Sequence, residues 1–238
     1  MELHDFREYQ PGDDLRHLDW NAVGRTGRLI LRVRKEEVAP RVEILVDASR
    51  SMAITERKRE RARELAALFE KMGRAQGLTP VLHWLADSPR RAAKEVPTDF
   101  DARRPLGEAL SRIALRPCGV RVLISDLLFE APLGPIFRRL ADGAARLAVV
   151  QVLDPDDEDP QSGEGARLVD SETDEALDRL LGWDVLQRYR KRLAAHLAAI
   201  EAEARRVRAA VCRVTAGEEL EACVRERLVG SVVEPRGR

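Results

Sequence analysis

The chain has 238 residues, of which 44% are hydrophobic and 34% charged, a balance typical of a folded domain with a substantial core. Basic and acidic residues number 41 each, so there is no overall positive charge to attract nucleic acid or anionic lipid. The three cysteines, Cys118, Cys212 and Cys223, are widely spaced, which favours a reducing compartment over a disulfide framework. No segment has the roughly 18 consecutive apolar residues of a membrane span. We therefore expect a cytoplasmic protein with neither a membrane span nor a nucleic-acid partner.

The N-terminal segment, residues 1–40, is expected to pack on the domain that follows it. Residues 1–27 contain a Pro11-Gly12 turn followed by closely spaced charged and aromatic side chains, which favours an ordered loop. Over residues 28–34 apolar side chains alternate with arginines. This period of two predicts a half-exposed strand at the edge of a sheet.

From residue 41 onward, short β-branched runs alternate with stretches in which apolar residues recur every three or four positions. The runs predict strands at 42–46, 81–85, 120–124, 147–152 and 209–214, with a further short edge strand at 166–169. The stretches predict helices at 62–72, 106–115, 135–140, 183–207 and 218–228, and an acidic solvated loop is expected at 155–160. This alternation predicts a Rossmann-like α/β domain over residues 41–230, with a mainly parallel central sheet and helices on both faces. Residues 231–238 are expected to form a disordered tail.

Polar side chains follow two of the predicted strands at their carboxyl ends, where the loops of a parallel sheet converge on a crevice. Asp47, Ser49 and Ser51 follow the first strand, and Asp126 follows the strand at 120–124. Alternate residues of the first loop can direct oxygen atoms at one centre, and Mg²⁺ prefers such ligands. These four residues are therefore our candidate metal site. In a simpler interpretation, Asp47 caps the next helix and the two serines close the turn.

Two motifs carry a resemblance to known families. The D-x-S-x-S element at Asp47 resembles the metal-ion-dependent adhesion site of von Willebrand factor A domains. Upstream, EYQPGDDLR at 8–16, LDW at 18–20 and RTG at 25–27 resemble the signature of the bacterial family called "domain of unknown function 58". The resemblance implies a von Willebrand factor A-like domain after the signature, a non-enzymatic protein-binding role, and a MoxR-type AAA+ ATPase as the partner. Leu153-Asp154-Pro155 also agrees with it.

One position departs from the family pattern. Von Willebrand factor A sites usually add a threonine before the helix that begins here near Pro105, but this chain has Arg104 at that place, and Thr98 is a poor substitute. An arginine beside Asp47 and Asp126 could pair with their carboxylates and occupy the place of the cation, or meet an acidic side chain of the partner. Whether Mg²⁺ or Arg104 supplies the positive charge is left open.

A Mg²⁺-dependent phosphoryl-transfer enzyme with Asp47 as nucleophile is the alternative function. The loop has Ser49 where such enzymes place a second aspartate, and no nearby lysine is evident. The glycines of a serine nucleophile elbow do not flank Ser49 or Ser51, and the chain has no glycine-rich phosphate loop. We therefore expect a non-enzymatic adaptor.

Overall fold

The computed structural model describes residues 4–10, 18–34, 41–92, 96–160, 167–169, 176–178 and 183–233. The chain divides into two compact units, Met1–Ala39 and Pro40–Arg238. Each unit is a structural body of its own, with its own strands and helices.

In its described residues, the first unit contains two strands and a helix, β1 (His4–Glu8), α1 (Trp20–Thr26) and β2 (Ile30–Arg34). The strands pair antiparallel in a two-stranded sheet. Helix α1 begins where the Asp19 carboxylate accepts hydrogen bonds from two backbone N–H groups of the first turn, and it ends at Gly27, which has a left-handed φ of 68°.

These elements correct two expectations for the first unit. A strand and a helix occupy much of the region expected to be a loop, residues 1–27. The strand predicted at 28–34 is present, but it pairs with β1 rather than with the main sheet. The Pro11-Gly12 turn lies outside the described residues, and the packing of residues 1–40 on the second unit stays a prediction.

The second unit is built on a six-stranded sheet in the order β10-β7-β6-β3-β4-β5. Its strands are β3 (Arg41–Asp47), β4 (Thr79–Leu85), β5 (Arg90–Arg91), β6 (Cys118–Ser125), β7 (Ala144–Leu153) and β10 (Ala210–Thr215). All neighbouring pairs are parallel except β4 and β5, which are antiparallel. The α/β, Rossmann-like prediction with a mainly parallel sheet is confirmed.

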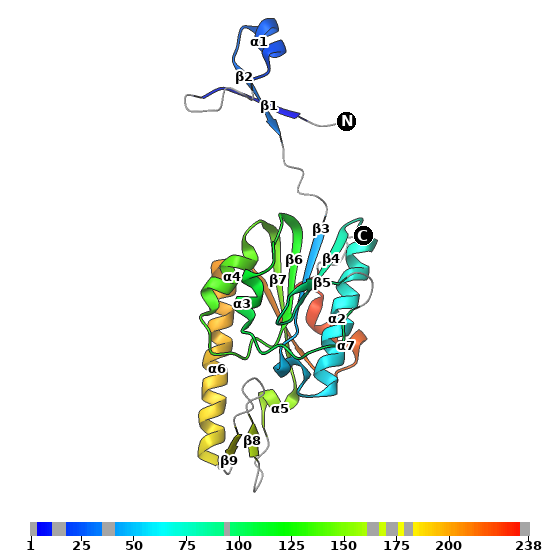
Figure 1. Ribbon diagram of the computed structural model, residues 1–238, viewed down its shortest axis with the longest axis vertical. Coiled ribbons are helices and arrows are strands. Elements are labelled where there is room, and N and C mark those ends of the chain that lie inside the picture. The colour runs from blue at the N-terminus through cyan, green and yellow to red at the C-terminus, as the bar shows by residue number, and fades with distance from the viewer. Residues whose placement is uncertain are drawn as a thin grey trace. The chain divides into compact units, whose positions relative to one another are not determined.

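Helices cover both faces of this sheet (Figure 1). They are α2 (Glu56–Ala75), α3 (Leu106–Ser111), α4 (Leu133–Ala141), α5 (Pro155–Glu158), α6 (Trp183–Arg206) and α7 (Leu220–Cys223), with the short turns η2 (Arg50–Ala53) and η3 (Val224–Leu228). Helices α2 and α7 pack on one face and α3, α4 and α6 on the other, so the core has two layers. Within β3, Ile44 and Val46 face the first layer and Leu45 the second, because successive strand side chains point to opposite faces.

Several local expectations are corrected here. The helix predicted at 106–115 ends at Ser111, and the acidic loop at 155–160 begins with the single helical turn α5. Strand β8 (Arg167–Val169) pairs with β9 (Ala176–Asp178) in a sheet of its own, not with the main sheet.

The C-terminal tail was expected from residue 231. Residues 231–233 instead form a turn, in which the Val233 N–H donates to the Leu228 carbonyl at 2.9 Å, and residues 234–238 lie outside the described part of the chain.

Strand β5 was not predicted from the sequence. It has two residues, Arg90 and Arg91, which pair with Trp84 and His83 of β4. Both arginines are exposed, and the Arg90 guanidinium donates to both carboxylate oxygens of Asp99 at 2.7 Å. The main sheet therefore has a short border of two arginines on this side, one of them paired with Asp99.

Among the described helices, none combines the length and the apolar character that crossing a membrane requires.

Candidate functional site

The strand order places the candidate site where the direction of chain crossing reverses. From β3 the chain continues to β4 on one side of the sheet, and it later returns to β6 on the other side. In α/β domains the loops that leave the carboxyl ends of two such strands diverge, and ligands bind at this point. The two ends meet directly, since the Ser125 hydroxyl donates to Asp47 Oδ2 at 2.6 Å.

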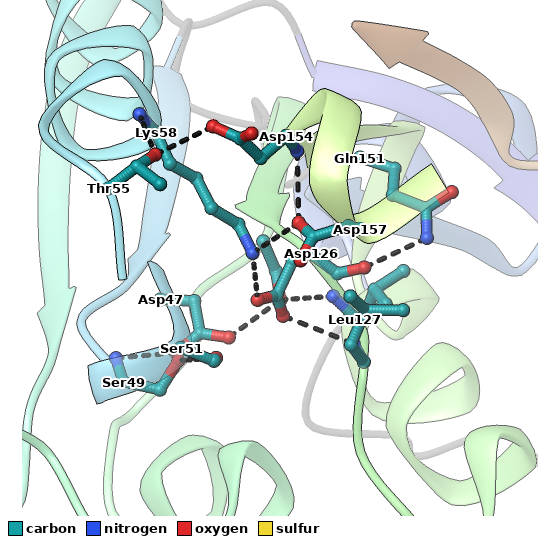
Figure 2. A network of polar contacts seen from close by, with 12 residues as sticks. Asp47, Ser49, Ser51, Thr55, Lys58, Asp126, Leu127, Gln151, Asp154 and Asp157 are labelled. Atoms are coloured by element: carbon teal, nitrogen blue, oxygen red, sulfur yellow. Dashed lines mark hydrogen bonds and ion pairs between the residues drawn. The ribbon is translucent and has the colours of Figure 1, made fainter. Parts of the chain in front are cut away.

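The loop after β3 is held in one shape by its own polar side chains. The Ser49 N–H donates to Asp47 Oδ1 at 3.0 Å, and the Ser49 and Ser51 hydroxyl oxygens lie 3.0 Å apart (Figure 2). The Ala102 N–H donates to the Ala48 carbonyl at 3.0 Å, and the Arg50 N–H donates to the Ala102 carbonyl at 3.2 Å, so this loop pairs with the loop before α3. Asp47 does not cap α2, because Thr55 accepts the capping hydrogen bond, so that part of the simpler interpretation is wrong, whereas the two serines do close the turn.

A buried lysine, which sequence reasoning missed, lies at the centre of the site. Lys58 is in the first turn of α2, and its ammonium donates to Asp126 Oδ2 and to Asp157 Oδ2, both at 2.8 Å (Figure 2). Its side chain is 0% exposed. A positive charge in the first turn of a helix opposes the helix dipole, so the two carboxylates must stabilise it here.

Asp126 is fixed from three directions besides Lys58. Its Oδ1 accepts a hydrogen bond from the Leu128 N–H at 3.1 Å, and its carbonyl accepts one from the Gln151 amide of β7 at 2.8 Å. The next residue, Leu127, has a left-handed φ of 53°, and its carbonyl lies 2.6 Å from a ring nitrogen of His196 in α6. The loop after β6 is thereby tied to β7 and α6.

The segment at α5 belongs to the site and is not a freely solvated loop. Asp154 accepts hydrogen bonds from the Thr55 hydroxyl at 2.7 Å and from the Arg57 guanidinium at 3.0 Å. Asp157 Oδ2 accepts one from the Asp154 N–H at 2.9 Å, completing a capping box. The Tyr189 hydroxyl of α6 donates to the Asp157 carbonyl. One network therefore joins the loop after β3, the start of α2, the end of β7 and α6.

Burial shapes the electrostatics of this network. Asp47 is 3% exposed and Asp126 is 1% exposed. Desolvation, with added repulsion from Asp126, raises the pKa of Asp47 to about 6, although hydrogen bonds from Ser125 and Ser49 act in the opposite direction. Desolvation alone would lower the pKa of Lys58, but the negative charges of Asp126 and Asp157 outweigh it and raise that pKa above its ordinary value.

Arg104 lies apart from this network. Its guanidinium pairs with Glu108, one helical turn further along, and its side chain is 40% exposed. Its backbone N–H donates to Asp87 at 2.9 Å, and Thr98 is exposed. The prediction that Arg104 pairs with the site carboxylates is wrong, because the guanidinium pairs with the exposed Glu108 in the first turn of α3. A role for Arg104 in partner binding stays a prediction.

The four predicted metal ligands are brought together, but their oxygens are already engaged. Each carboxylate oxygen of Asp47 and Asp126 accepts a hydrogen bond, one of them from the Lys58 ammonium. Within the described ranges, no group of three or more His, Cys, Asp and Glu side chains is placed to hold a metal ion. A cation such as Mg²⁺ would therefore fit only if it displaced the lysine.

Together the fold and the site define a Rossmann-like α/β protein with a buried carboxylate and lysine cluster at its topological switch point. The chain belongs to the family described as "Protein of unknown function DUF58", whose model matches residues 5–203. Among solved structures it is similar to the conserved hypothetical protein BatB from Bacteroides thetaiotaomicron, with 14% identity and a TM-score of 0.39, over 78% of this chain and 95% of that one. No curated protein matches the chain significantly.

Proposed function

We propose that this domain is a non-enzymatic adaptor that binds a partner protein at the mouth of its sheet. The observation that carries the proposal is the Lys58 network, which ties the loops after β3, β6 and β7 into one rigid surface at the switch point. A surface that is already ordered loses little conformational entropy when a partner docks, so rigidity favours binding. The carboxylates serve mainly to hold this surface in place.

The accessible part of the mouth includes one large apolar side chain. Ile54 follows η2 directly and is 58% exposed, while its neighbour Thr55 is fixed by its bond to Asp154. Apolar anchors held by a rigid frame are typical contacts at the centre of a protein interface. Ile54 is therefore the docking residue that we would change first.

A MoxR-type AAA+ ATPase is the partner that we propose. Family membership supports this choice, since the resemblance to the "domain of unknown function 58" signature implied such an ATPase. The chain has no glycine-rich phosphate loop of its own, so in such a complex nucleotide hydrolysis would belong to the partner.

The test is a binding titration between the purified chain and a MoxR-type ATPase from the same organism. Ile54→Asp should weaken binding at least about tenfold, because it places a charge in an apolar contact. Val229→Asp is the matched control, because Val229 is also an exposed apolar residue, with 41% exposure. The turn that follows it lines a cavity near the first residues of β3 and β6, whereas the mouth lies at the last residues of these strands. Unchanged binding by both Ile54→Asp and Asp47→Asn would remove the mouth from the mechanism, and no binding by the wild type would reject this partner.

Mg²⁺-dependent phosphoryl transfer remains the second candidate, because the lysine that seemed to be missing is present at the site. The geometry is less suited to it, however, since Lys58 contacts Asp126 and Asp157, and both oxygens of the candidate nucleophile Asp47 accept hydrogen bonds. We expect no turnover of an aryl phosphate with Mg²⁺ present. Turnover that disappears in Asp47→Asn would establish an enzyme and overturn the adaptor proposal.

A further inference from the structure

The buried cluster at the mouth contains more carboxylates than cations. The Lys58 ammonium lies between Asp126 and Asp157, and Asp47 approaches the same cluster through its bond from Ser125, which directly precedes Asp126 (Figure 2). These carboxylates come from three separate segments, the ends of β3 and β6 and the helix α5. Oxygen ligands that converge from several loops are the arrangement that holds a hard divalent cation in other proteins.

We propose that the Lys58 ammonium is the resident cation of this site and neutralises its carboxylates instead of a divalent metal ion. It bridges the loop after β6 to α5 with two bonds of 2.8 Å, as a bridging metal ion would. The domain therefore keeps its mouth ordered with no metal bound. This inference depends on the geometry of the cluster and not on the adaptor function.

An incoming metal ion would meet two costs. It would have to push the ammonium away from its carboxylates, although the Lys58 side chain is 0% exposed and its charge is paired only inside the protein. An unpaired buried ammonium is strongly unfavourable. In addition, Mg²⁺ gives up its own water reluctantly. We therefore expect the wild-type chain not to bind Mg²⁺ or Mn²⁺ at this site.

If the adaptor proposal is also correct, the lysine changes how a partner is recognised. An open metal ion can take a carboxylate of the partner as a ligand, whereas the Lys58 ammonium is buried and faces two carboxylates of its own chain. Partner binding should then be insensitive to a chelator such as EDTA.

The test uses the isolated full chain and Mn²⁺ as the probe, followed by electron paramagnetic resonance of the free ion. Wild type should leave the Mn²⁺ free, and Lys58→Ala should bind one ion at least about tenfold more tightly than wild type. Lys71→Ala is the matched control, since Lys71 lies on the same helix but is exposed, and it should behave as wild type. Adding Asp126→Asn to Lys58→Ala should abolish the gained binding.

A second variant covers the case in which Lys58→Ala does not fold. Lys58→Gln removes the charge but keeps an N–H donor for one carboxylate, so it retains part of the bridge. The proposal is overturned if a folded Lys58 variant binds Mn²⁺ no better than wild type. It is also overturned if wild type binds Mn²⁺ and loses it in Asp126→Asn, a result that needs no Lys58 variant. Failure of the partner titration leaves all these measurements unaffected.

Discussion

Two fully buried cations in the second unit, Arg121 and Lys58, are held in different ways. The Arg121 guanidinium donates two hydrogen bonds to Glu43 Oε2, at 2.8 and 3.0 Å. Its other donors reach the carbonyls of Arg116, Leu140 and Asp142 at 2.6 to 2.8 Å. One cation thus meets one carboxylate, and every donor is used.

The lysine cluster has the opposite balance, because several carboxylates surround one compact charge. A guanidinium has a fixed fork of donors, whereas an ammonium is a point charge that another cation can replace. The arginine cluster fastens β3 to β6, while the lysine cluster leaves an excess of negative charge around one ammonium. If the lysine cluster is the functional site, burial and ion pairing alone do not mark function, and an excess of charge of one sign at strand ends is the more useful signal.

Arg121→Met should have the largest effect on stability. It leaves Glu43 buried without a cation and three carbonyls without their donor, so we expect a loss of about 3–5 kcal/mol in the free energy of unfolding. Urea unfolding measures it, and Mg²⁺ should not restore any of the loss. Arg112→Met, which removes an exposed arginine, is the control and should change stability by less than about 0.5 kcal/mol.

Lys58→Ala should have the next largest effect, about 3 kcal/mol, because it leaves Asp126 and Asp157 facing each other without a cation. Here millimolar Mg²⁺ or Mn²⁺ should restore part of the stability, since a ligand that binds only the folded state shifts the equilibrium toward it. Thermal unfolding with and without the ion measures the recovery. An ion that stabilises the Arg121 and Lys58 variants equally would erase the distinction between the clusters.

The two clusters should also respond to pH with opposite signs. Burial alone would raise the pKa of Glu43, but His83 and Arg121 lower it to about 2. His83 lies 3.8 Å from Glu43, too far for a hydrogen bond, so we assign the lowering chiefly to Arg121. Ionised Glu43 therefore contributes to the stability of the folded state at pH values above its unfolded pKa of 4.5, and this contribution is lost as the pH falls toward 2. Because the pKa of Asp47 is raised, its protonated form contributes to stability at pH values below its unfolded pKa of 3.8, and this contribution is lost as the pH rises through about 6.

Glu43→Gln and Asp47→Asn test these signs through their unfolding free energies between acidic and neutral pH. Relative to wild type, Asp47→Asn should gain stability as the pH rises from about 4 to 7, by at most about 3 kcal/mol. Glu43→Gln should lose relative stability as the pH rises from strongly acidic values toward 5. Parallel pH profiles for the two variants would contradict the assignment.

Arg104→Thr should have the smallest effect. The exposed pair of Arg104 with Glu108 contributes little, so stability should change by less than about 0.5 kcal/mol, and no Mn²⁺ site should appear. The measurements are urea unfolding and Mn²⁺ titration. If this variant binds Mn²⁺ and Lys58→Ala does not, Arg104 and not Lys58 is the residue that takes the place of a metal ion.

The sequence predicted the second unit well because its elements have strong periodicity. The β-branched run of β3 and the stripe of Ala62, Leu65 and Phe69 in α2 both lie in the core. Asp47 and Asp126 were brought together by reasoning about neighbouring parallel strands, whose ends must share one edge of the sheet. Helix α1 was missed although Asp19 and Gly27 stand at cap spacing, because a seven-residue helix has too few turns for a clear stripe.

Lys58 could not be recognised from its neighbours. It lies in the run Arg57, Lys58 and Arg59, which has the pattern of a solvated helix face, and only the fold turns one of the three inward. A usable signal existed for Asp157. The spacing of Asp154, Pro155 and Asp157 is that of a capping box with proline in the first turn, which predicts a helix start instead of a loop.

The two-residue strand β5 has a consequence for the behaviour of the domain at high concentration. An open parallel sheet ends in unpaired backbone groups, to which another chain can add a strand. On this side the described margin includes the strand of Arg90 and Arg91, which runs against the direction of the other strands. So short an edge strand offers few backbone groups for pairing, so copies of the domain are discouraged from joining their sheets and aggregating through this side.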